Sequence, residues 1–595
     1  MPSTGVDGSK GSCLGLRNDA TVSCAPLPRA CLPLVAVLSL AGTGLARAEG
    51  AMAPNPGQPS LAACPFPDTS RPELWHGEHT WQALQRHGYV IGHIDIVVDD
   101  VFDLSNPKED TWYGRAADAL HIKTHTKAVA EQLLIAPGQV VDARRIYESE
   151  RKLRALSYLR FADIIPVACT ASTVDVAAHV KDAWSLKFDL SFNHVGGQSN
   201  LGASFEDVNF LGTGKTLMVG HKSDVQRSSN QVSYQDPALA GSRWTLATTY
   251  AHLSDGFTRS VDVGQPFYED QAPWSLFVHY LDQQQNLNFY QDSAVAWRAA
   301  DITQKTELDW MHLLYWDGQA GMRAGLAYID EDIRYGNLQS LPPQQTLVRP
   351  TLTPRRFSGA GGTYEYYQDN YGTFTNIALM GRTEDYNVGW DDKVELGYFS
   401  EMLGSRVPAW FYDFSSSYGS EPWDDSLFLS SAELRGRHHQ QREQGLDGQM
   451  LFTLYNQKLP HQTLVLHGEL GYSLRPDPED LQYLGGLQGM PGYPNFFLIG
   501  DRRWQGNISD RINTNVYVLN IFQLGFAVYA DAGQIRQLGD AGWSRTLADA
   551  GIALRLGDVR SAYGGVIYIT YAWPLVKLQP GATSRQFVVG NIINF

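Results

Sequence analysis

The chain has 595 residues, a formal net charge of -16 and 11% aromatic residues, among them 15 tryptophans and 29 tyrosines. Behind its leader it contains no run approaching the roughly 18 uncharged apolar residues that a membrane-spanning helix requires. The acidic balance and the lack of a basic face argue against nucleic acid as a partner. A membrane protein without spanning helices must pair its backbone between the strands of a closed barrel, and abundant Trp and Tyr suit the aromatic girdles of such a barrel.

An export signal lies unusually far into the chain. An apolar segment from Cys31 to Leu45 is followed at once by an Ala-Arg-Ala sequence that ends at Ala48, which has the small-x-small form of a cleavage site. We therefore expect residues 1–48 to be a signal peptide region, whose long lead is either an extended n-region or an upstream start that is not used. Residues 49–87, rich at first in Pro, Ala and Gly, are expected to form a periplasmic linker.

Two cysteines, Cys64 and Cys169, remain after cleavage behind Ala48. Cys64 ends four residues that match a lipoprotein box in letters, but such a box must adjoin the apolar segment of the signal, and several prolines separate the two. In an oxidising periplasm Cys64 and Cys169 can form one disulfide, and two unpaired thiols are equally compatible with the sequence.

Residues 88–182 are expected to form a small α+β domain with both helices on one face of a sheet. Alternating apolar residues indicate strands, and apolar residues at helical spacing indicate helices. In chain order, the expected elements are a strand at 94–98, a helix at 126–134, a helix that begins with Asp142 as its N-cap, and strands near 161–167 and 173–180.

This arrangement resembles a POTRA (polypeptide-transport-associated) domain. The residues that carry the likeness are Gly138 before the second helix, the charged run 148–154 within it, Tyr158 and Leu159 after it, and residues 174–176 in the last strand. The charged run is expected to be a solvated helix face. The likeness therefore depends on the arrangement of the elements and not on these charges.

From Trp184 to Phe192 apolar and polar residues alternate, the pattern of a lipid-facing barrel strand. A soluble β-sandwich alternates in the same way. However, strands of about 10 residues or more here, at 242–252 and at 516–530 are longer than usual for a sandwich. We therefore expect a mainly β chain in which residues 183–595 form a transmembrane antiparallel β-barrel of about 16 strands, at roughly 25 residues for each strand with its connection.

The last strand ends on an aromatic carboxy-terminus. Gly590, Ile593 and Phe595 form a Gly-x-x-Ile-x-Phe sequence, and Phe587 lies on the same face as Ile593 and Phe595. This pattern resembles the insertion signal by which bacterial outer-membrane β-barrels are captured. An ordinary edge strand that happens to end at Phe595 is the plainer alternative.

Four segments of the barrel region match the pattern of one superfamily. They are a second-strand signature at 204–215, a Tyr-x-Asp-Pro turn at 234–244, a loop 6 motif at 485–494 and an Asp-Ala-Gly strand at 529–533. Together with the POTRA-like region they resemble the POTRA-bearing outer-membrane assembly factors typified by BamA and TamA, also called bacterial surface antigens. The likeness covers about 90 to 595 and is weak between roughly 260 and 460.

The loop 6 motif departs from the family at one position. Gly485, Gly486, Gly492 and Tyr493 match it, but Pro491 stands where the family carries an arginine thought to anchor the loop inside the barrel. Proline offers no donor, and no uncharged residue reproduces the planar fork of donors of arginine.

Two nearby arginines are candidates to replace the missing charge. Either Arg502 or Arg503 takes over the anchoring, or the loop is held less tightly, or transport activity is lost. Ser509 also stands where an acidic partner is expected. We expect loop 6 still to fold into the lumen, with Arg502 or Arg503 supplying the charge.

The resemblance implies an outer-membrane protein assembly or translocation factor. Unfolded protein clients would add a strand to the sheet edge of the POTRA domain in the periplasm and then be inserted or passed through a seam between the first and last barrel strands, where Gly590 weakens pairing. The implied partners are outer-membrane lipid, clients and periplasmic chaperones, and the barrel is monomeric. The alternative is a passive channel or a structural surface-antigen barrel, although a simple porin has no need of residues 88–182.

No motif indicates an enzyme, a cofactor or a metal. Residues 212–216 lack the first glycine of a phosphate loop, and residues 197–200 lead into a leucine where a nucleophile elbow needs its second glycine. His121 and His125 have no third ligand. An outer-membrane phospholipase or protease is therefore the third and least supported hypothesis.

Overall fold

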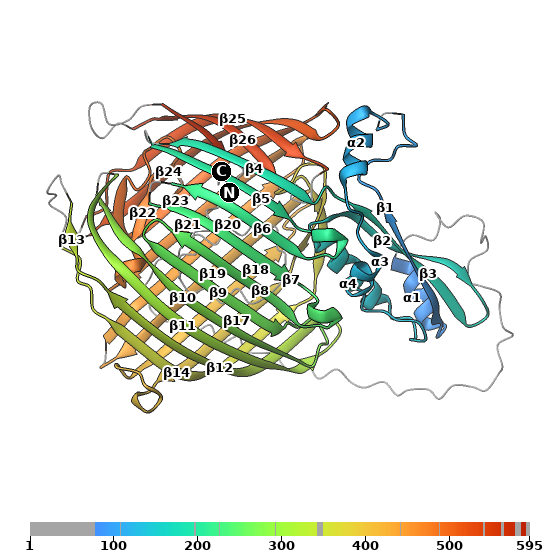
Figure 1. Cartoon of the computed structure of the whole chain (residues 1–595), viewed down its shortest axis with the longest axis horizontal. Helices are drawn as coiled ribbons and strands as arrows, with labels where there is room; N and C mark the ends of the chain where they lie inside the picture. Colours follow the sequence, from blue (N-terminus) through green and yellow to red (C-terminus); the bar gives the residue numbers. More distant parts are fainter. Residues whose placement is uncertain are drawn as a thin grey trace.

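The computed structural model describes residues 78–590, apart from 108, 196–197, 225, 292, 342–348, 441, 487, 539–541, 561–564 and 577–584. A small domain of helices and strands lies at one end of a large barrel (Figure 1). Among the described residues, no helix is long and apolar enough to cross a membrane. The expected signal region 1–48, Cys64, Ile593 and Phe595 lie outside the described residues.

The small domain contains the five elements expected from the sequence, in the expected order. Its sheet has the order β1-β3-β2, with β1 parallel and β2 antiparallel to β3. Asp142 caps the second helix, because its side chain accepts hydrogen bonds from two N–H groups of the first helical turn. These elements are β1 (Val90–Asp99), α3 (Thr126–Ala130), α4 (Ala143–Ala155), β2 (Leu159–Cys169) and β3 (Thr173–Asp182).

Two further helices, α1 (Glu78–Arg86) and α2 (Trp112–Leu120), are additional to that prediction. The linker expected over 49–87 is therefore wrong for residues 78–86. Trp81 and Leu84 of α1 are buried in the core of the domain, so this helix is part of the fold. The Pro-rich composition that precedes α1 conceals this short amphipathic helix.

The helix expected over 126–134 is shorter than predicted. α3 ends at Ala130 and is followed by tighter turns, in which the N–H groups of Gln132 and Leu133 donate to the carbonyl oxygens three residues before them, at 3.0 and 3.2 Å. Arg243 of a barrel turn donates hydrogen bonds to the carbonyl oxygens of Glu131 (2.7 Å) and Leu133 (2.9 Å) in this segment.

The core of the small domain lies between α4 and the sheet. Ile146 and Leu153, seven residues apart on one face of α4, are fully buried together with Val174 and Val176 of β3. Burying each such side chain contributes about 1.5–3 kcal/mol relative to leaving it exposed.

Apart from β15 (Tyr371–Thr375) and β16 (Thr383–Asn387), which pair only with each other, the remaining strands are hydrogen-bonded in a closed ring that runs from β4 to β27 and back to β4. They are β4 (Leu186–Val195), β5 (Gln198–Asp207), β6 (Thr216–Ser223), β7 (Ser228–Asp236), β8 (Thr245–Leu253), β9 (Gly256–Gln265), β10 (Trp274–Gln291), β11 (Ala294–Trp316), β12 (Ala320–Tyr335), β13 (Gln339–Ser340), β14 (Arg355–Gln368), β17 (Trp390–Phe399), β18 (Ala409–Ser420), β19 (Ser426–His439), β20 (Arg442–Asn456), β21 (Gln462–Leu474), β22 (Gln482–Leu484), β23 (Leu498–Val518), β24 (Phe522–Gln537), β25 (Leu547–Asp558), β26 (Val566–Pro574) and β27 (Gln586–Gly590).

The ring has more strands than predicted. β13 pairs with β11 beyond the end of β12, and β22 pairs with β23 beyond the end of β21. β13 therefore continues β12, and β22 continues β21, as one interrupted strand in each case. Counted in this way, the 22 described strands of the ring make 20 barrel strands. The expected number of about 16 is therefore too low. Several connections, such as the two residues between β8 and β9, are much shorter than the prediction assumed.

Side chains of the barrel alternate between the lumen and the outer surface. On β23 and β24 the buried, inward positions include Asn507, Arg511 and Asp531, whereas Ile508 and Val528 are exposed on the outside. This polar-inside and apolar-outside pattern is typical of a barrel with lipid around it.

The sequence places a strand at 242–252, and β8 occupies most of that range. The segment 516–530, expected as one strand, is instead the end of β23, a tight turn and the start of β24. Leu519 and Asn520 adopt positive φ values of 53° and 51° in this turn. Neither is a glycine or a proline, so the sequence carries no strong signal for the turn.

The ring closes between β27 and β4. The closure lies within a run of short strands, with 9 residues in β26 and 8–10 in each strand from β4 to β9, whereas β10, β11 and β23 have 18, 23 and 21. A transmembrane β-strand needs about 9–11 residues. The closure is therefore flanked by strands of the minimum length for a membrane.

Because the strands are antiparallel, their connections alternate between the two ends of the barrel. Those at 208–215, 237–244, 266–273 and 369–389 lie at the end that bears the small domain, which we call the near mouth. The connection 475–497 lies at the opposite end, the far mouth.

Candidate functional site

The connection 475–497, between β21 and β23, contains the predicted loop 6 motif and is called loop 6 here. It includes a short 3-10 helix, η5 (Pro478–Asp480), and β22. Tyr493 is fully buried with Met490, against Ile535 of β24 and Leu547 of β25. These are inward positions of both strands, so loop 6 lies inside the lumen.

Tyr493 fastens the middle of loop 6 to the barrel wall. Its hydroxyl lies 2.9 Å from the carbonyl oxygen of Ala548, 2.8 Å from that of Val576 and 3.2 Å from the N–H of Ala548. Because the ring is fully buried and its hydroxyl is hydrogen-bonded, both parts of this side chain stabilise the inward position of the loop.

The two glycines at the start of the motif allow a tight approach. Gly485 and Gly486 have φ values of 121° and 58°, which side chains rarely adopt. A Cβ on Gly486 would lie 2.1 Å from Oδ1 of Asn495, on the returning part of loop 6. Glycine is therefore required where the two arms of the loop meet.

Pro491 is buried, and its neighbour Gly492 donates a hydrogen bond to the carboxylate of Asp549. Asp531, on the adjacent strand, lies beside Asp549 and accepts a hydrogen bond of 2.7 Å from Asn507. Within the described residues neither aspartate forms an ion pair. Two neighbouring buried carboxyl groups favour a shared proton or a nearby cation, so the place beside Pro491 is chemically suited to the arginine that the sequence lacks.

Arg503, and not Arg502, contacts loop 6. The Arg503 guanidinium donates to the carbonyl oxygens of Tyr483 (2.9 Å) and Gln488 (3.4 Å) and pairs with the buried Glu469 of β21. Arg502 instead donates to the hydroxyl of Tyr472 at 2.8 Å. Of the two candidates, Arg503 is the one placed to hold the loop.

Loop 6 also reaches the opposite wall of the barrel. Phe496 stacks on Tyr290 of β10 with ring centroids 4.2 Å apart, and Tyr483 of β22 meets both rings edge to face. β10 lies far from β23 in the ring order. The loop thus crosses the lumen near the far mouth.

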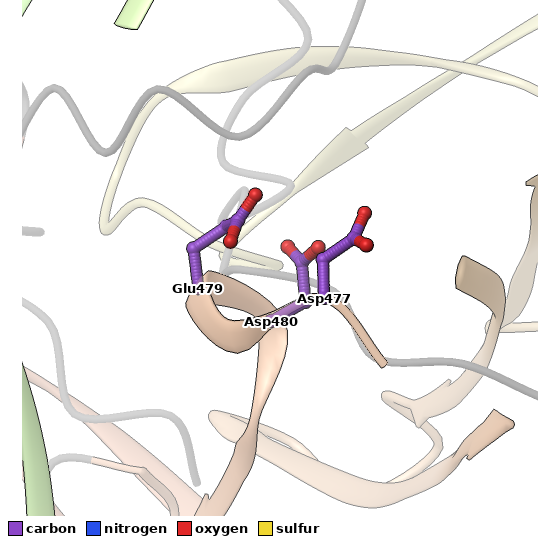
Figure 2. A group of neighbouring side chains, drawn as sticks. All are labelled: Asp477, Glu479 and Asp480. Carbon is purple, nitrogen blue, oxygen red and sulfur yellow. The ribbon is translucent and has the colours of Figure 1, made fainter. Parts of the chain in front are cut away.

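The start of loop 6 carries three acidic residues, Asp477, Glu479 and Asp480, whose carboxylates lie within 4.8 Å of one another (Figure 2). Arg355 of β14 pairs with Asp477 at 3.0 Å and also with Glu479, and Arg437 of β19 pairs with Asp477 at 2.6 Å. Arginines therefore balance the charge of this cluster and tie it to two barrel strands.

A second set of contacts joins α4 to connections at the near mouth. Arg145 pairs with Glu269 (2.9 Å), Arg151 with Asp270 (3.1 Å) and Asp369 (2.6 Å), and Arg154 with Asp385 (2.9 Å). The expectation that residues 148–154 form a solvated face is therefore wrong. Their acidic partners lie more than 100 residues away in the chain, so the sequence alone could not identify them.

Burial shifts the pKa of several groups of α4, and it raises the pKa of Glu150 to about 7. Burial, followed by the neighbouring Asp270 carboxylate, raises the pKa of Glu148 to about 8, although Arg151 and Arg144 oppose the shift. Burial lowers the pKa of Lys152 to about 8. The junction therefore contains ionisable groups that titrate near neutral pH.

Two of the predicted family segments, 204–215 and 234–244, form turns that contact the small domain. Lys215, at the end of the second-strand signature, pairs at 3.0 Å with Asp236 of the Tyr-x-Asp-Pro turn. The carbonyl of Gly212 accepts a hydrogen bond of 2.8 Å from the N–H of His125, beside α3. His121 pairs with the buried Asp182 at 2.8 Å. The turns at 208–215 and 237–244 are therefore hydrogen-bonded to the small domain, through Gly212 and Arg243.

Cys169 is disulfide-bonded. The four other cysteines of the sequence, Cys64 among them, lie outside the described residues. The bridge between Cys64 and Cys169 therefore stays a prediction.

No family model matches this sequence, and no curated protein matches it. Several solved structures are similar. CdiB from Escherichia coli matches with 12% identity over 84% of this chain and 76% of its own, with a TM-score of 0.41. CdiB from Acinetobacter baumannii matches with 14% identity over 84% and 73%, with a TM-score of 0.38. BamA from Haemophilus ducreyi, in a form lacking POTRA domains 1–3, matches with 12% identity over 84% of both chains, with a TM-score of 0.36. The chain is similar to CdiB and BamA.

Proposed function

We propose that this chain is an outer-membrane protein assembly or translocation factor. Its barrel spans the bacterial outer membrane, and the small domain is a single POTRA domain in the periplasm. The proposal is supported by the family motifs of the sequence, by the β1-β3-β2 sheet of the small domain and by a loop 6 that crosses the lumen.

The observation that carries the proposal is the ion-paired junction between α4 and the near mouth. Three arginines of α4 pair with four acidic residues of barrel connections. Partly buried ion pairs of this kind fix an orientation, since removing one partner leaves a buried charge. A domain held at the mouth is placed to deliver a polypeptide, whereas a simple pore needs no such domain.

The same arrangement suggests where a client enters. Within the described residues β1 and β2 are the edges of the small sheet, and the start of β1 is covered by residues 138–141. The rest of β1 offers backbone groups for strand addition. The edge of β2 is less suited to it, because the N–H of Ile164 donates to Glu150 of α4 at 2.8 Å and Pro166 has no N–H. The client would then pair at the closure between β4 and β27, which short strands flank on both sides.

The alternative, a passive channel or a structural surface-antigen barrel, is less well supported, because loop 6 crosses the lumen near the far mouth, with Tyr493 packed on one wall and Phe496 on the other. An open pore would leave this region to water. The partners that follow from the proposal are outer-membrane lipid, unfolded protein clients and periplasmic chaperones, and the barrel acts as a monomer without a cofactor or enzymatic activity.

The proposal is tested with the full chain in liposomes. A urea-unfolded outer-membrane β-barrel protein is added as the client, and its folding is followed by the shift in gel migration of unheated samples. We expect faster folding than in empty liposomes, and an Arg151→Ala, Arg154→Ala double variant should lose most of the acceleration. A wild-type rate equal to that in empty liposomes, together with steady ion conductance, would favour the passive channel.

A further inference from the structure

A second segment enters the lumen, from the near mouth. The connection 369–389 joins β14 to β17 and contains β15 (Tyr371–Thr375) and β16 (Thr383–Asn387), which pair only with each other. We call residues 371–387 the strap. Its tip, residues 376–382, lies between the two short strands.

The backbone of the strap is hydrogen-bonded to residues at β20, β21 and β23, three to five places from β17 in the ring order. Gln457, after β20, donates to the carbonyl oxygen of Thr375 at 2.7 Å, and Thr463 of β21 donates to that of Asn376 at 3.3 Å. Arg511 of β23 donates to the carbonyl of Ile377 at 3.0 Å. These are specific polar contacts, as expected for a segment with a fixed place in the structure.

Met380 carries the apolar part of the contact. It is fully buried in a cluster with Ala527 of β24, Ala553 of β25 and Tyr568 of β26, all at inward positions. A Cβ on Gly557 would lie 2.4 Å from the Cβ of Met380. The absence of a side chain at Gly557 thus makes room for Met380.

The strap therefore spans the near mouth. It leaves the ring between β14 and β17, and its tip packs on β24, β25 and β26. Five barrel strands separate β17 from β24 in the ring order: β18, β19, β20, β21 and β23. A segment that joins positions so far apart on the ring must cross the opening between them.

Glu384 holds the tip in its shape. Its carboxylate accepts hydrogen bonds from three successive N–H groups, those of Ile377 (3.0 Å), Ala378 (3.0 Å) and Leu379 (3.2 Å), and from the hydroxyl of Tyr386 (3.1 Å). A turn braced in this way can move as one body, because its internal contacts do not depend on the wall.

The strap is also joined to the small domain. Arg154 of α4 pairs with Asp385, and Arg382 donates to the carbonyl oxygen of Leu159, the first residue of β2, at 3.2 Å. The base of the strap follows Asp369, the partner of Arg151. A movement of α4 relative to the barrel would therefore pull on the strap at both ends.

We propose that the strap is a gate that closes the near mouth of the barrel and opens when the small domain moves. This inference rests on the proposed function for the meaning of that movement, since a client captured by the domain would supply it. Loop 6 closes the far mouth, so the two segments enclose the lumen from both sides.

The test is the rate at which a membrane-impermeant thiol reagent labels a cysteine at Ser509, an inward and almost fully buried position midway along β23. The full chain carrying Ser509→Cys is labelled in detergent, and the background is measured in the chain without this substitution. In a Met380→Asp variant the tip should leave its apolar site, and labelling should accelerate at least about tenfold. The matched control is Met402→Asp, because Met402 is 96% exposed at the far mouth.

A second arm tests the coupling to the domain. Arg154→Ala and Asp385→Ala should each accelerate labelling, and the double variant should do so no more than either alone. Gel migration of unheated samples shows that each variant is folded. Unchanged labelling in folded Met380→Asp would overturn the gate, and additive effects of the two substitutions would overturn its coupling to α4. If the gate behaves as expected but the chain does not accelerate client folding, the proposed function fails and the gate remains.

Discussion

At the scale of single residues, the anchoring of loop 6 depends on one arginine that the family pattern does not specify. Arg503 lies on the inward face of β23 and bonds both to the backbone of loop 6 and to the buried Glu469. Alternation along the strand places Arg503 on the same face as the polar residues Asn507 and Ser509. That face distinguishes it from Arg502, so the sequence contained the information needed to choose between the two.

Replacing Arg503 should loosen loop 6. In Arg503→Ala, Glu469 keeps its burial but loses its cation, a change that costs about 3–5 kcal/mol when a buried pair is broken. We expect a lower temperature for the change in gel migration and faster cleavage of loop 6 by protease added outside. Arg502→Ala is the control, since Arg502 contacts Tyr472 and should change both readouts little. Equal effects of the two variants would contradict this account.

A guanidinium at position 491 should strengthen the loop. Pro491 adjoins Gly492, which is bonded to Asp549, and Asp549 lies beside Asp531 with no ion pair for either within the described structure. In Pro491→Arg the new charge can meet these carboxylates, so we expect slower proteolysis of loop 6. Pro491→Leu should not show this protection. If Pro491→Arg is cleaved faster than Pro491→Leu, the buried guanidinium has found no partner.

At the scale of elements, α4 is where sequence and structure differ most. The position of α4 and its Asp142 cap follow from local patterns, and both were predictable. The ion pairs of its arginines were not predictable. Their acidic partners lie in barrel connections that only the folded chain brings together: Glu269, Asp270, Asp369 and Asp385. α3 also ends earlier than its apolar spacing predicts, and the carbonyl of Glu131 just after its end accepts a hydrogen bond from the distant Arg243.

The contact of α4 with the barrel should weaken as pH rises from about 5 to 8. Burial raises the pKa of Glu148 to about 8, well above the value of about 4.3 for a free glutamate. The docked domain therefore binds more protons than the undocked domain in this interval, so docking is lost as pH rises through the folded pKa. Lys152, whose pKa burial lowers to about 8, acts in the opposite direction only above that pH.

This dependence is measured by amide hydrogen exchange of α4 at pH 6 and pH 8, corrected for the intrinsic rate. We expect protection to fall by at least about tenfold, which corresponds to the 1.4 kcal/mol of one pKa unit. Glu148→Gln should flatten the dependence. Protection that rises with pH, or an equal slope in both proteins, would contradict the assignment to Glu148.

At the scale of the whole molecule, the barrel was predictable as a class and not in its dimensions. Alternation from Trp184 onward indicates a barrel whatever the number of strands. The number itself depends on the turns, and turns such as Leu519 and Asn520 carry neither glycine nor proline, so apolar alternation runs through them without interruption. The prediction of about 16 strands assumed roughly 25 residues for each strand with its connection, and the ring holds 20 barrel strands because several connections, such as that between β8 and β9, are much shorter.

Two segments enter the lumen of the barrel, loop 6 at the far mouth and the strap at the near mouth. Loop 6 was expected from its motif, whereas the strap lies in the part of the chain where the family likeness is weak. The strap tip contacts the barrel wall through one methionine and several backbone groups, and such contacts leave no periodic pattern in the sequence. If the strap closes the near mouth as proposed, a client would be released sideways through the closure between β27 and β4.

The most direct test of the central claim is site-specific photo-crosslinking at the closure between β27 and β4. A photoreactive residue at Phe587, which is 53% exposed on the outer face of β27, is activated in growing cells, and the same probe at Leu326 of β12, 62% exposed on the far side of the ring, is the control. The account predicts adducts with incompletely folded polypeptide clients at Phe587 and none at Leu326. Adducts with lipid alone at both positions would contradict it.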